Sequence, residues 1–214
     1  MTETIWPTPY WPEGVARDVS GYDRPLFSVL DEAARAYPDK TYTLFNGAGR
    51  TFAQVKDTAD RIANFLVSRG IRKGDRVAIF LPNLPHYAPL YFGILKAGAV
   101  TVTCNPLYTP SELNYQLNDS GARAVFCMDH PVFYPTACEA VKNTLVETVV
   151  ICNVKSYLPP LKGFIGGLLG KIPKAASHEP NHLMFDKVVA AARPDSHSLI
   201  LLPSYAINIS CHPP

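Results

Sequence analysis

The sequence predicts an α/β fold, with about five strands in a doubly wound, mostly parallel sheet and helices on both faces. Four short apolar runs predict strands, at residues 77–81, 99–104, 124–128 and 148–152. Helical patterns alternate with these runs, as they do in the βαβ units of a parallel sheet. The run Val77–Leu81 is apolar at every position, which is typical of a strand that is covered on both faces.

The first predicted helix spans Pro25 to Tyr37 and follows an irregular N-terminal arm at residues 1–22. Proline suits the first helical position because its missing N–H would be unpaired there in any case. Pro38 should end the helix. Apolar residues recur at helical spacing and should form one stripe, made of Leu26, Val29, Leu30, Ala33, Ala34 and Tyr37.

A β-hairpin is predicted over residues 42–52, because Asn46 and Gly47 both tolerate the positive φ of a tight turn. The Gly47-x-Gly49 pattern is not a dinucleotide-binding fingerprint, since no third glycine follows at the required spacing. Thr51 and Gln54 then form a capping box that opens a helix. That helix should run to about Ser68 and bury Val55, Ala59, Ile62, Ala63 and Leu66.

Four further helices are predicted, over residues 86–97, 110–121, 132–143 and 183–192. The second of them has another capping box, Thr109 with Glu112, and Pro110 at its first position. Glycines Gly70, Gly98 and Gly121 should end the preceding helices. The alternation is complete by residue 154.

These elements divide the chain into five segments. The irregular arm at 1–22 precedes an α/β subdomain at 23–154. A Gly/Pro-rich, apolar excursion with interleaved lysines occupies residues 155–182, and a helix with a connector occupies 183–195. The tail at 196–214 is aberrant, although Leu199–Leu202 could form one more strand.

Composition excludes two classes of protein. Apolar residues make up 47% and charged residues 18% of the 214 residues, which is enough apolar content for a packed core and too little charge for a disordered chain. The net charge is only +2, which argues against a nucleic-acid partner.

The five cysteines form no C-x-x-C pair and are expected to be buried thiols in a reducing, cytoplasmic compartment. They are Cys104, Cys127, Cys138, Cys152 and Cys211.

Membrane insertion is not expected. The N-terminus lacks the basic and apolar regions of a signal peptide. Residues 77–95 contain no Asp, Glu, Lys or Arg, but Pro82, Pro85 and Pro89 argue against a membrane span.

The apolar, lysine-containing stretch 156–176 has two interpretations, a peripheral contact with a membrane surface or an ordinary surface loop. Within it, Gly163–Lys171 is no phosphate loop, because Ile165 and Ile172 occupy positions that require Gly and Ser/Thr.

No catalytic, cofactor-binding or metal-binding residue can be assigned. His178 and His182 have the spacing of metal ligands on a helix, but Pro180 interrupts them and no third ligand is near in sequence. His86 and His130 are expected to cap elements or lie on the surface. The pairs Asp75–Arg76 and Asp129–His130 precede or follow predicted strands. Ligands gather at the carboxyl ends of strands in open α/β sheets, which makes Asn83 and Asn105 the candidates for lining a pocket, with turn formation as the alternative.

Four segments together resemble the long-chain fatty acyl-CoA ligases of the AMP-forming, adenylate-forming superfamily. They are Arg50–Val55, Gly74–Asn83, Ile94–Ala99 with Asn105–Leu113, and Leu117–Ala122. Their order and spacing match that family over about residues 20–195. The resemblance implies an incomplete N-terminal domain of a ligase that uses fatty acid, ATP, Mg²⁺ and CoA.

The resemblance also implies a two-step reaction, in which acyl-adenylate forms with release of pyrophosphate and CoA then displaces AMP. That chemistry needs a Gly/Ser/Thr-rich phosphate loop after Asp195, yet no glycine occurs in 196–214. We hypothesise that this tail arises from a frameshift or a truncated gene model, which reading the other two frames downstream would test. The isolated chain is therefore expected to be inactive and, with apolar faces uncovered, to self-associate. Two alternatives remain open: a non-catalytic module that binds a partner or a complementing chain, and an independent Rossmann-like domain for a small ligand.

Overall fold

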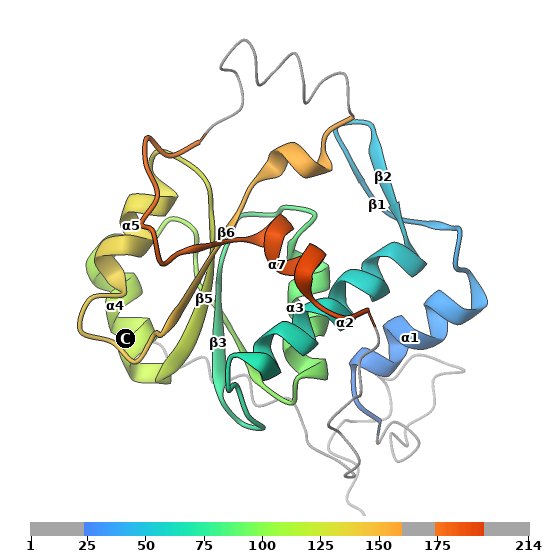
Figure 1. Ribbon diagram of the computed structural model, residues 1–214, viewed down its shortest axis with the longest axis horizontal. Coiled ribbons are helices and arrows are strands. Elements are labelled where there is room, and N and C mark those ends of the chain that lie inside the picture. Colours follow the sequence, from blue (N-terminus) through green and yellow to red (C-terminus); the bar gives the residue numbers. More distant parts are fainter. Residues whose placement is uncertain (1–23, 160–173, 195–214) are drawn as a thin grey trace, which may run out of the picture. The chain divides into compact units, whose positions relative to one another are not determined.

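The computed structural model describes residues 24–159 and 174–194, and the elements named below lie within the unit Leu26–Leu202. Five parallel strands form one sheet in the order β4-β3-β5-β6-β7 (Figure 1). From β3 the chain adds β4 on one side and β5 on the other, so the direction of winding reverses at β3. The strands are β3 (Arg76–Phe80), β4 (Val100–Thr103), β5 (Ala122–Met128), β6 (Thr148–Cys152) and β7 (Leu183–Met184).

Helices cover both faces of the sheet (Figure 1). One face carries α2 (Phe52–Ser68), α3 (Tyr87–Lys96) and α7 (Phe185–Ala191), and the other carries α4 (Pro110–Ser120) and α5 (Phe133–Ala140). Successive side chains of a strand point to opposite faces of the sheet, so β3 contributes side chains to two cores. Val77 and Ile79 lie in the core under α2 and α3, whereas Ala78 and Phe80 lie in the core under α4 and α5. The predicted doubly wound α/β fold is confirmed.

The first helix, α1 (Phe27–Ala36), packs on α2 and α3 rather than on the sheet. It buries Phe27, Leu30 and Ala34, a narrower stripe than the sequence predicted. Pro25 lies before the helix and not at its first position, since Leu26 is the N-cap residue. The predicted stripe residues that remain exposed are Leu26, Val29 and Tyr37.

The predicted hairpin is confirmed. Strands β1 (Thr41–Phe45) and β2 (Ala48–Thr51) pair antiparallel, and the turn residues Asn46 and Gly47 have φ angles of 51° and 90°. Both turn residues therefore adopt the left-handed conformation that an Asn-Gly pair accepts at low cost. The hairpin places Arg50 beside the start of α2.

Both predicted capping boxes form. The hydroxyl of Thr51 accepts from the N–H of Gln54 at 3.3 Å, and the Gln54 side chain accepts from the N–H of Thr51 at 3.0 Å. Thr109 and Glu112 make the same reciprocal pair at the start of α4. These bonds satisfy N–H groups that a helix start leaves unpaired. Along α2, all five predicted core residues are buried.

The last predicted helix is corrected in part. Leu183 and Met184 form β7, which pairs in parallel with Val150 and Ile151 of β6, and α7 begins only at Phe185. A strand of two apolar residues has no periodicity to detect, so only its hydrogen bonds to β6 identify it. The expectations for residues 1–22, Gly163–Lys171, Leu199–Leu202 and the tail at 196–214 lie outside the described residues.

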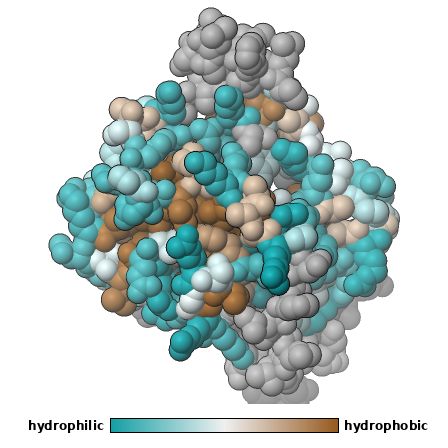
Figure 2. Space-filling model, in the orientation of Figure 1, coloured by the Kyte–Doolittle hydropathy of each residue, from teal (hydrophilic) through white to brown (hydrophobic). Residues whose placement is uncertain are grey.

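Cys104, Cys127 and Cys152 are buried as predicted, whereas Cys138 is half-buried and Cys211 lies outside the described part. Figure 2 shows apolar side chains gathered on the face of the molecule between α5 and α7. There β6 is buried from Val149 to Cys152, and β7 is half-buried. Among the described residues, no helix has the length and apolar character needed to span a bilayer.

Candidate functional site

The carboxyl-terminal ends of the five strands lie at one edge of the sheet, the place where open α/β folds bind ligands. Asn83 and Asn105, the predicted pocket-lining residues, are both exposed at this edge and line neither of the two hollows described below. The side-chain oxygen of Asn105 accepts from the N–H of Leu107 at 3.0 Å. The structure thus gives Asn105 the turn-forming role that was its alternative interpretation.

Asp129, which directly follows β5, is a buried junction of three hydrogen bonds. Its side chain is 2% exposed. One carboxylate oxygen accepts from Nδ2 of Asn153 at 2.8 Å, and the other accepts from the N–H of Ala175 at 2.8 Å and lies 2.9 Å from Nε2 of His178. These bonds tie the ends of β5 and β6 to the segment that leads into β7. A buried carboxylate is tolerable only with such partners.

The two histidines with metal-ligand spacing turn to different partners. His178 contacts Asp129, whereas Nδ1 of His182 lies 2.8 Å from the hydroxyl of Tyr134. That hydroxyl also accepts from the N–H of Glu179 at 2.7 Å, and it can donate its own proton to Nδ1 of a neutral His182. Burial lowers the pKa of His182, which favours this neutral form. Within residues 24–159 and 174–194, no three His, Cys, Asp or Glu side chains are placed to hold a metal ion.

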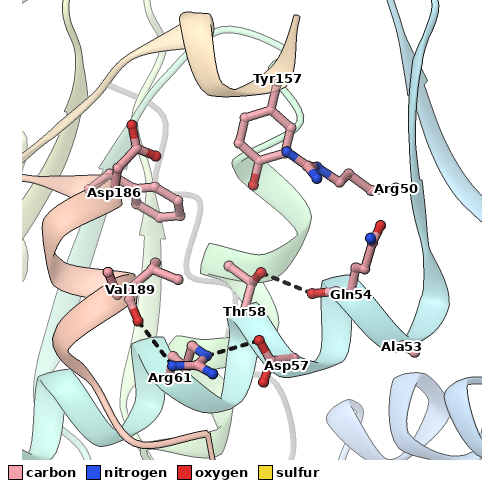
Figure 3. Close-up of a pocket in the computed structure, with 11 residues that line it drawn as sticks. Arg50, Ala53, Gln54, Asp57, Thr58, Arg61, Tyr157, Asp186 and Val189 are labelled. Carbon is pink, nitrogen blue, oxygen red and sulfur yellow. Dashed lines mark hydrogen bonds and ion pairs between the residues drawn. The ribbon is translucent and has the colours of Figure 1, made fainter. Parts of the chain in front are cut away.

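A hollow of about 650 Å³, the α2–α7 hollow, opens at this edge between β2, α2, α7 and the 3₁₀-helix η3 (Val154–Tyr157). Figure 3 shows Arg50 and Gln54 on one side, Asp186 on the other, and the Tyr157 hydroxyl directed inward. The guanidinium of Arg50 lies over the ring of Tyr157, 5.1 Å from its centroid. Such stacking orients both side chains.

The base of the α2–α7 hollow is held by Arg61 of α2 (Figure 3). Its Nε donates to Asp57 at 2.9 Å, and its Nη1 donates to the carbonyl of Ala192 at 2.8 Å and of Val189 at 3.4 Å. A cation at a helix C-terminus satisfies carbonyls that have no partner within the helix and opposes the negative end of its dipole. Arg61 therefore docks the short helix α7 on α2.

Behind the hollow, His86 packs between two of its aromatic walls. Its ring centroid lies 4.4 Å from that of Tyr157 and 4.8 Å from that of Phe185. The side chain is fully buried, and neither ring nitrogen has a hydrogen-bond partner among the described residues. Burial lowers the pKa of His86 to about 3, and the nearby backbone of Asn153 opposes this only in part. The expectation of a capping or surface role for His86 is wrong, because η3 and α7 cover it.

His130 and the pair Asp75–Arg76 have local structural roles. Nδ1 of His130 accepts from the N–H of Val132 at 3.1 Å, as expected for a residue at the start of an element. Asp75 accepts from the N–H of Arg72 at 2.8 Å, at the amino-terminal edge of the sheet, and this bond is the main cause of its lowered pKa. Arg76 donates to the carbonyl of Ser120 at 2.6 Å.

A buried charge cluster joins the helices on the α2 face, and the sequence did not reveal it. Lys96 of α3, 1% exposed, donates to Asp60 of α2 at 2.6 Å and also to Asp31 of α1. Lys56 donates to the second oxygen of Asp60 at 2.6 Å. Asp31, Lys56 and Asp60 line a second hollow of about 420 Å³. The Lys56–Asp60 pair could be expected from its i,i+4 spacing, but nothing near Lys96 in sequence indicates its partners.

This edge therefore holds an open hollow that is lined by charged, amide and phenol groups.

Three comparisons with known proteins bear on the function. The profile of the AMP-binding enzyme family matches residues 30–182. The long-chain-fatty-acid–CoA ligase of Bacillus subtilis is 35% identical over 177 residues, which are 83% of this chain and 30% of that ligase. The ligase of the same name from Salmonella typhimurium is 36% identical over 75% of this chain and 29% of its own. A crystal structure of a long-chain-fatty-acid–CoA ligase from Archaeoglobus fulgidus matches with a TM-score of 0.61 and 21% identity, over 83% of this chain and 32% of that one.

Proposed function

Because this chain belongs to the family of AMP-binding enzymes, we propose that it contributes the first part of a fatty acid–CoA ligase that joins long-chain fatty acids to CoA with ATP. The observation that carries this proposal is the 35% identity to the Bacillus subtilis ligase over 83% of the chain. The chain spans less than a third of the length of the curated relatives described above. The complete reaction, its substrates and its use of Mg²⁺ are therefore proposed and not observed.

Within such a ligase, the 214 residues would supply scaffold rather than chemistry. Transfer of the adenylyl group needs backbone N–H groups that hold phosphates and carboxylates that hold Mg²⁺. The sequence contains no Gly/Ser/Thr-rich loop of that type. We therefore propose that this polypeptide alone forms no acyl-adenylate. Its unpaired cysteines support a reducing, cytoplasmic compartment as its site of action.

Two experiments test these statements separately. Residues 24–194 would replace the matching segment of the Bacillus subtilis ligase, and the chimera would be assayed for CoA-dependent acyl-CoA formation. We expect activity with a long-chain fatty acid, and a folded but inactive chimera would contradict the assignment. In the second experiment, the chain alone is incubated with ATP, Mg²⁺ and a fatty acid. Pyrophosphate release above the blank would contradict the proposal that it is inactive by itself.

The alternative that the chain is a stand-alone partner-binding module, or self-associates, draws support from the apolar side chains that Figure 2 shows between α5 and α7. Exposed apolar patches of this kind mark surfaces that another chain covers. Size-exclusion chromatography at several concentrations would show a dimer or larger species if this holds, and a monomer throughout would exclude self-association. Contact of residues 156–176 with a membrane stays a separate prediction, tested by sedimentation with anionic vesicles.

The alternative of an independent small-ligand domain draws support from the α2–α7 hollow. Thermal shift with ATP·Mg²⁺, CoA, an acyl-adenylate analogue and a dinucleotide distinguishes the alternatives. Stabilisation by the dinucleotide alone would favour the Rossmann-like interpretation over the ligase one. Stabilisation by the adenylate analogue would contradict the proposal that the phosphate-binding parts are absent.

A further inference from the structure

The strand β4 (Val100–Thr103) forms one edge of the sheet, since β3 is its only neighbour in the described part of the chain. Native proteins protect such edges with very short strands, prolines, charged side chains or bulges, because an open edge pairs with a strand of another chain. The opposite edge strand, β7, is protected by its length of only two residues. In contrast, β4 is longer, contains neither proline nor charge, and pairs with β3 without a bulge.

The side chains of β4 suit a strand that pairs on both sides. Its sequence is Val-Thr-Val-Thr, and β-branched residues are enriched in strands because they pack well on a pleated surface. Val100 and Thr103 are exposed, whereas Thr101 and Val102 are half-buried. None of the four residues is fully buried, so the edge is accessible to another strand.

Alternate residues along β4 direct their backbone groups toward β3. The N–H of Val100 donates to the carbonyl of Asp75 at 2.8 Å, and the N–H of Cys104 donates to the carbonyl of Ile79 at 3.0 Å. In a parallel ladder, Thr101 and Thr103 therefore point their N–H and C=O groups to the open side. Nε2 of Gln116 lies 3.3 Å from the carbonyl oxygen of Thr103, which still has a second lone pair.

The spacing of Thr101 and Thr103 suits antiparallel pairing with a second copy of the same strand, about a two-fold axis at Val102. In that register, Thr101 lies opposite Thr103 of the second copy, and the two residues exchange both of their N–H···O=C bonds. Thr103 makes the same exchange with Thr101 of the second copy. The contact is self-complementary, so it closes with two copies.

The charges at the two ends of this edge are complementary in the same arrangement. The turn before β3 carries the exposed side chains of Arg72 and Lys73 and lies beside the residues that lead into β4. The acid of that turn, Asp75, is held in an ion pair. Glu112 is exposed at the opposite end of β4, one helical turn from Gln116. Antiparallel pairing brings the basic end of one copy to the acidic end of the other, which favours a second copy over an unrelated strand.

We propose that two copies of this chain pair antiparallel through their β4 edges, with the two-fold axis at Val102, and so form one continuous sheet. The proposal concerns the 214-residue chain itself and does not rest on the proposed ligase function. A single short strand from each copy is a small contact beside the roughly 1,200–2,000 Å² that stable complexes bury. We therefore expect a reversible dimer whose population rises with concentration.

Cysteine cross-linking tests the register. Residues opposite each other at a position without ladder hydrogen bonds have Cβ atoms about 4.5–5.5 Å apart, which is close to disulfide distance. In diamide, Val102→Cys should form a dimer linked between the two cysteines at position 102, identified by mass spectrometry of the joined peptides. Leu145→Cys is the control, because Leu145 is exposed but precedes β6, and the parent chain gives the background of its native cysteines. Equal cross-linking of Leu145→Cys, or no link at position 102, would overturn the proposal.

Sedimentation equilibrium between about 10 μM and 1 mM tests the edge itself. Thr103→Pro removes an outward-facing N–H at both symmetric pairs, so it should weaken dimerisation about tenfold or more. The matched control is Thr103→Val, which keeps the N–H and the β-branched shape and should change the dissociation constant less than about threefold. If Thr103→Pro fails to fold, Thr103→Lys, which places a like charge on each edge, decides instead. A monomeric parent chain at all concentrations, or a dimer that both edge variants leave intact, would refute β4 pairing.

Discussion

Nζ of Lys96 lies 2.6 Å from Oδ1 of Asp60, and these side chains are only 1% and 3% exposed. The pair joins α3 to α2, and Asp31 extends it to α1. Removing one member of a buried ion pair leaves the other charged and without compensation, which typically costs about 3–5 kcal/mol. Lys96→Met leaves Asp60 paired with Lys56, so we expect a smaller loss, of up to about 3 kcal/mol, in urea unfolding.

The matched control for Lys96→Met is Lys142→Met. Lys142 pairs with Glu139, but both side chains are more than half exposed, so the pair adds little stability. Its loss should change the free energy of unfolding by less than about 0.5 kcal/mol. Equal effects of the two substitutions would show that the buried cluster does not stabilise the contact between the helices.

Close packing of α2 on α3 depends on Gly93. A Cβ atom at this position would lie 2.8 Å from the carbonyl oxygen of Ala59 and 2.8 Å from Cβ of Ile62. Alanine would gain helix propensity, by about 1 kcal/mol, but the clash with backbone outweighs this gain. We expect Gly93→Ala to lower the free energy of unfolding by about 1–3 kcal/mol.

Gly49→Ala is the control for Gly93→Ala, because the same added methyl group would meet only an ordinary contact at 3.4 Å. Its φ angle is not in the left-handed region, so no backbone strain arises. A similar loss of stability in both variants would contradict the role given to the α2–α3 contact.

Buried His86 should make the fold sensitive to mild acid. Its folded-state pKa of about 3 lies below its ordinary value of 6.5, so the unfolded chain takes up a proton first as the pH falls. The stabilisation that comes from keeping His86 neutral is fully present above pH 6.5. It is lost progressively between pH 6.5 and 3, at about 1.4 kcal/mol per pH unit, for a total of roughly 5 kcal/mol. His182, whose pKa is also lowered by burial, acts in the same direction.

His86→Phe tests this pH dependence. The variant keeps an aromatic ring between Tyr157 and Phe185 and cannot take up a proton. Unfolding curves between pH 7 and 5 should show a smaller loss of stability for the variant than for the parent chain. We restrict the window to pH 5 and above because carboxylates such as Asp75, with its lowered pKa, add their own acid dependence below it. Identical slopes would contradict the assignment to His86.

Asp129 should hold the segment before β7 in place. Asp129→Ala removes the acceptor of the buried N–H of Ala175 and of the side chains of Asn153 and His178. We expect a loss of about 3 kcal/mol and faster hydrogen exchange at Ala175 and in β7 than in β3. Exposed Asp119→Ala is the control and should change neither quantity. Unchanged exchange at Ala175 in Asp129→Ala would rule out this anchoring role.

Much of the fold follows from local chemistry that is visible in the sequence. The Asn46-Gly47 turn, the Thr51–Gln54 and Thr109–Glu112 capping boxes and the apolar strand at β3 all depend on neighbours within a few residues. Such signals need no knowledge of the rest of the molecule, because φ preferences, end-capping and periodicity act over one or two turns of chain. Alternation of these elements then indicated a parallel sheet between two helical layers.

Only the tertiary structure decided the partners that lie far apart in sequence. Lys96 meets Asp60 across 36 positions, Asp129 meets His178 across 49, and His86 is buried because η3 and α7 close over it. The strand β7 consists of only two residues, and it forms because their backbone pairs with the open edge of β6. Burial and long-range hydrogen bonds arise from how the layers pack, and no local pattern of residue types records which side chains that packing brings together.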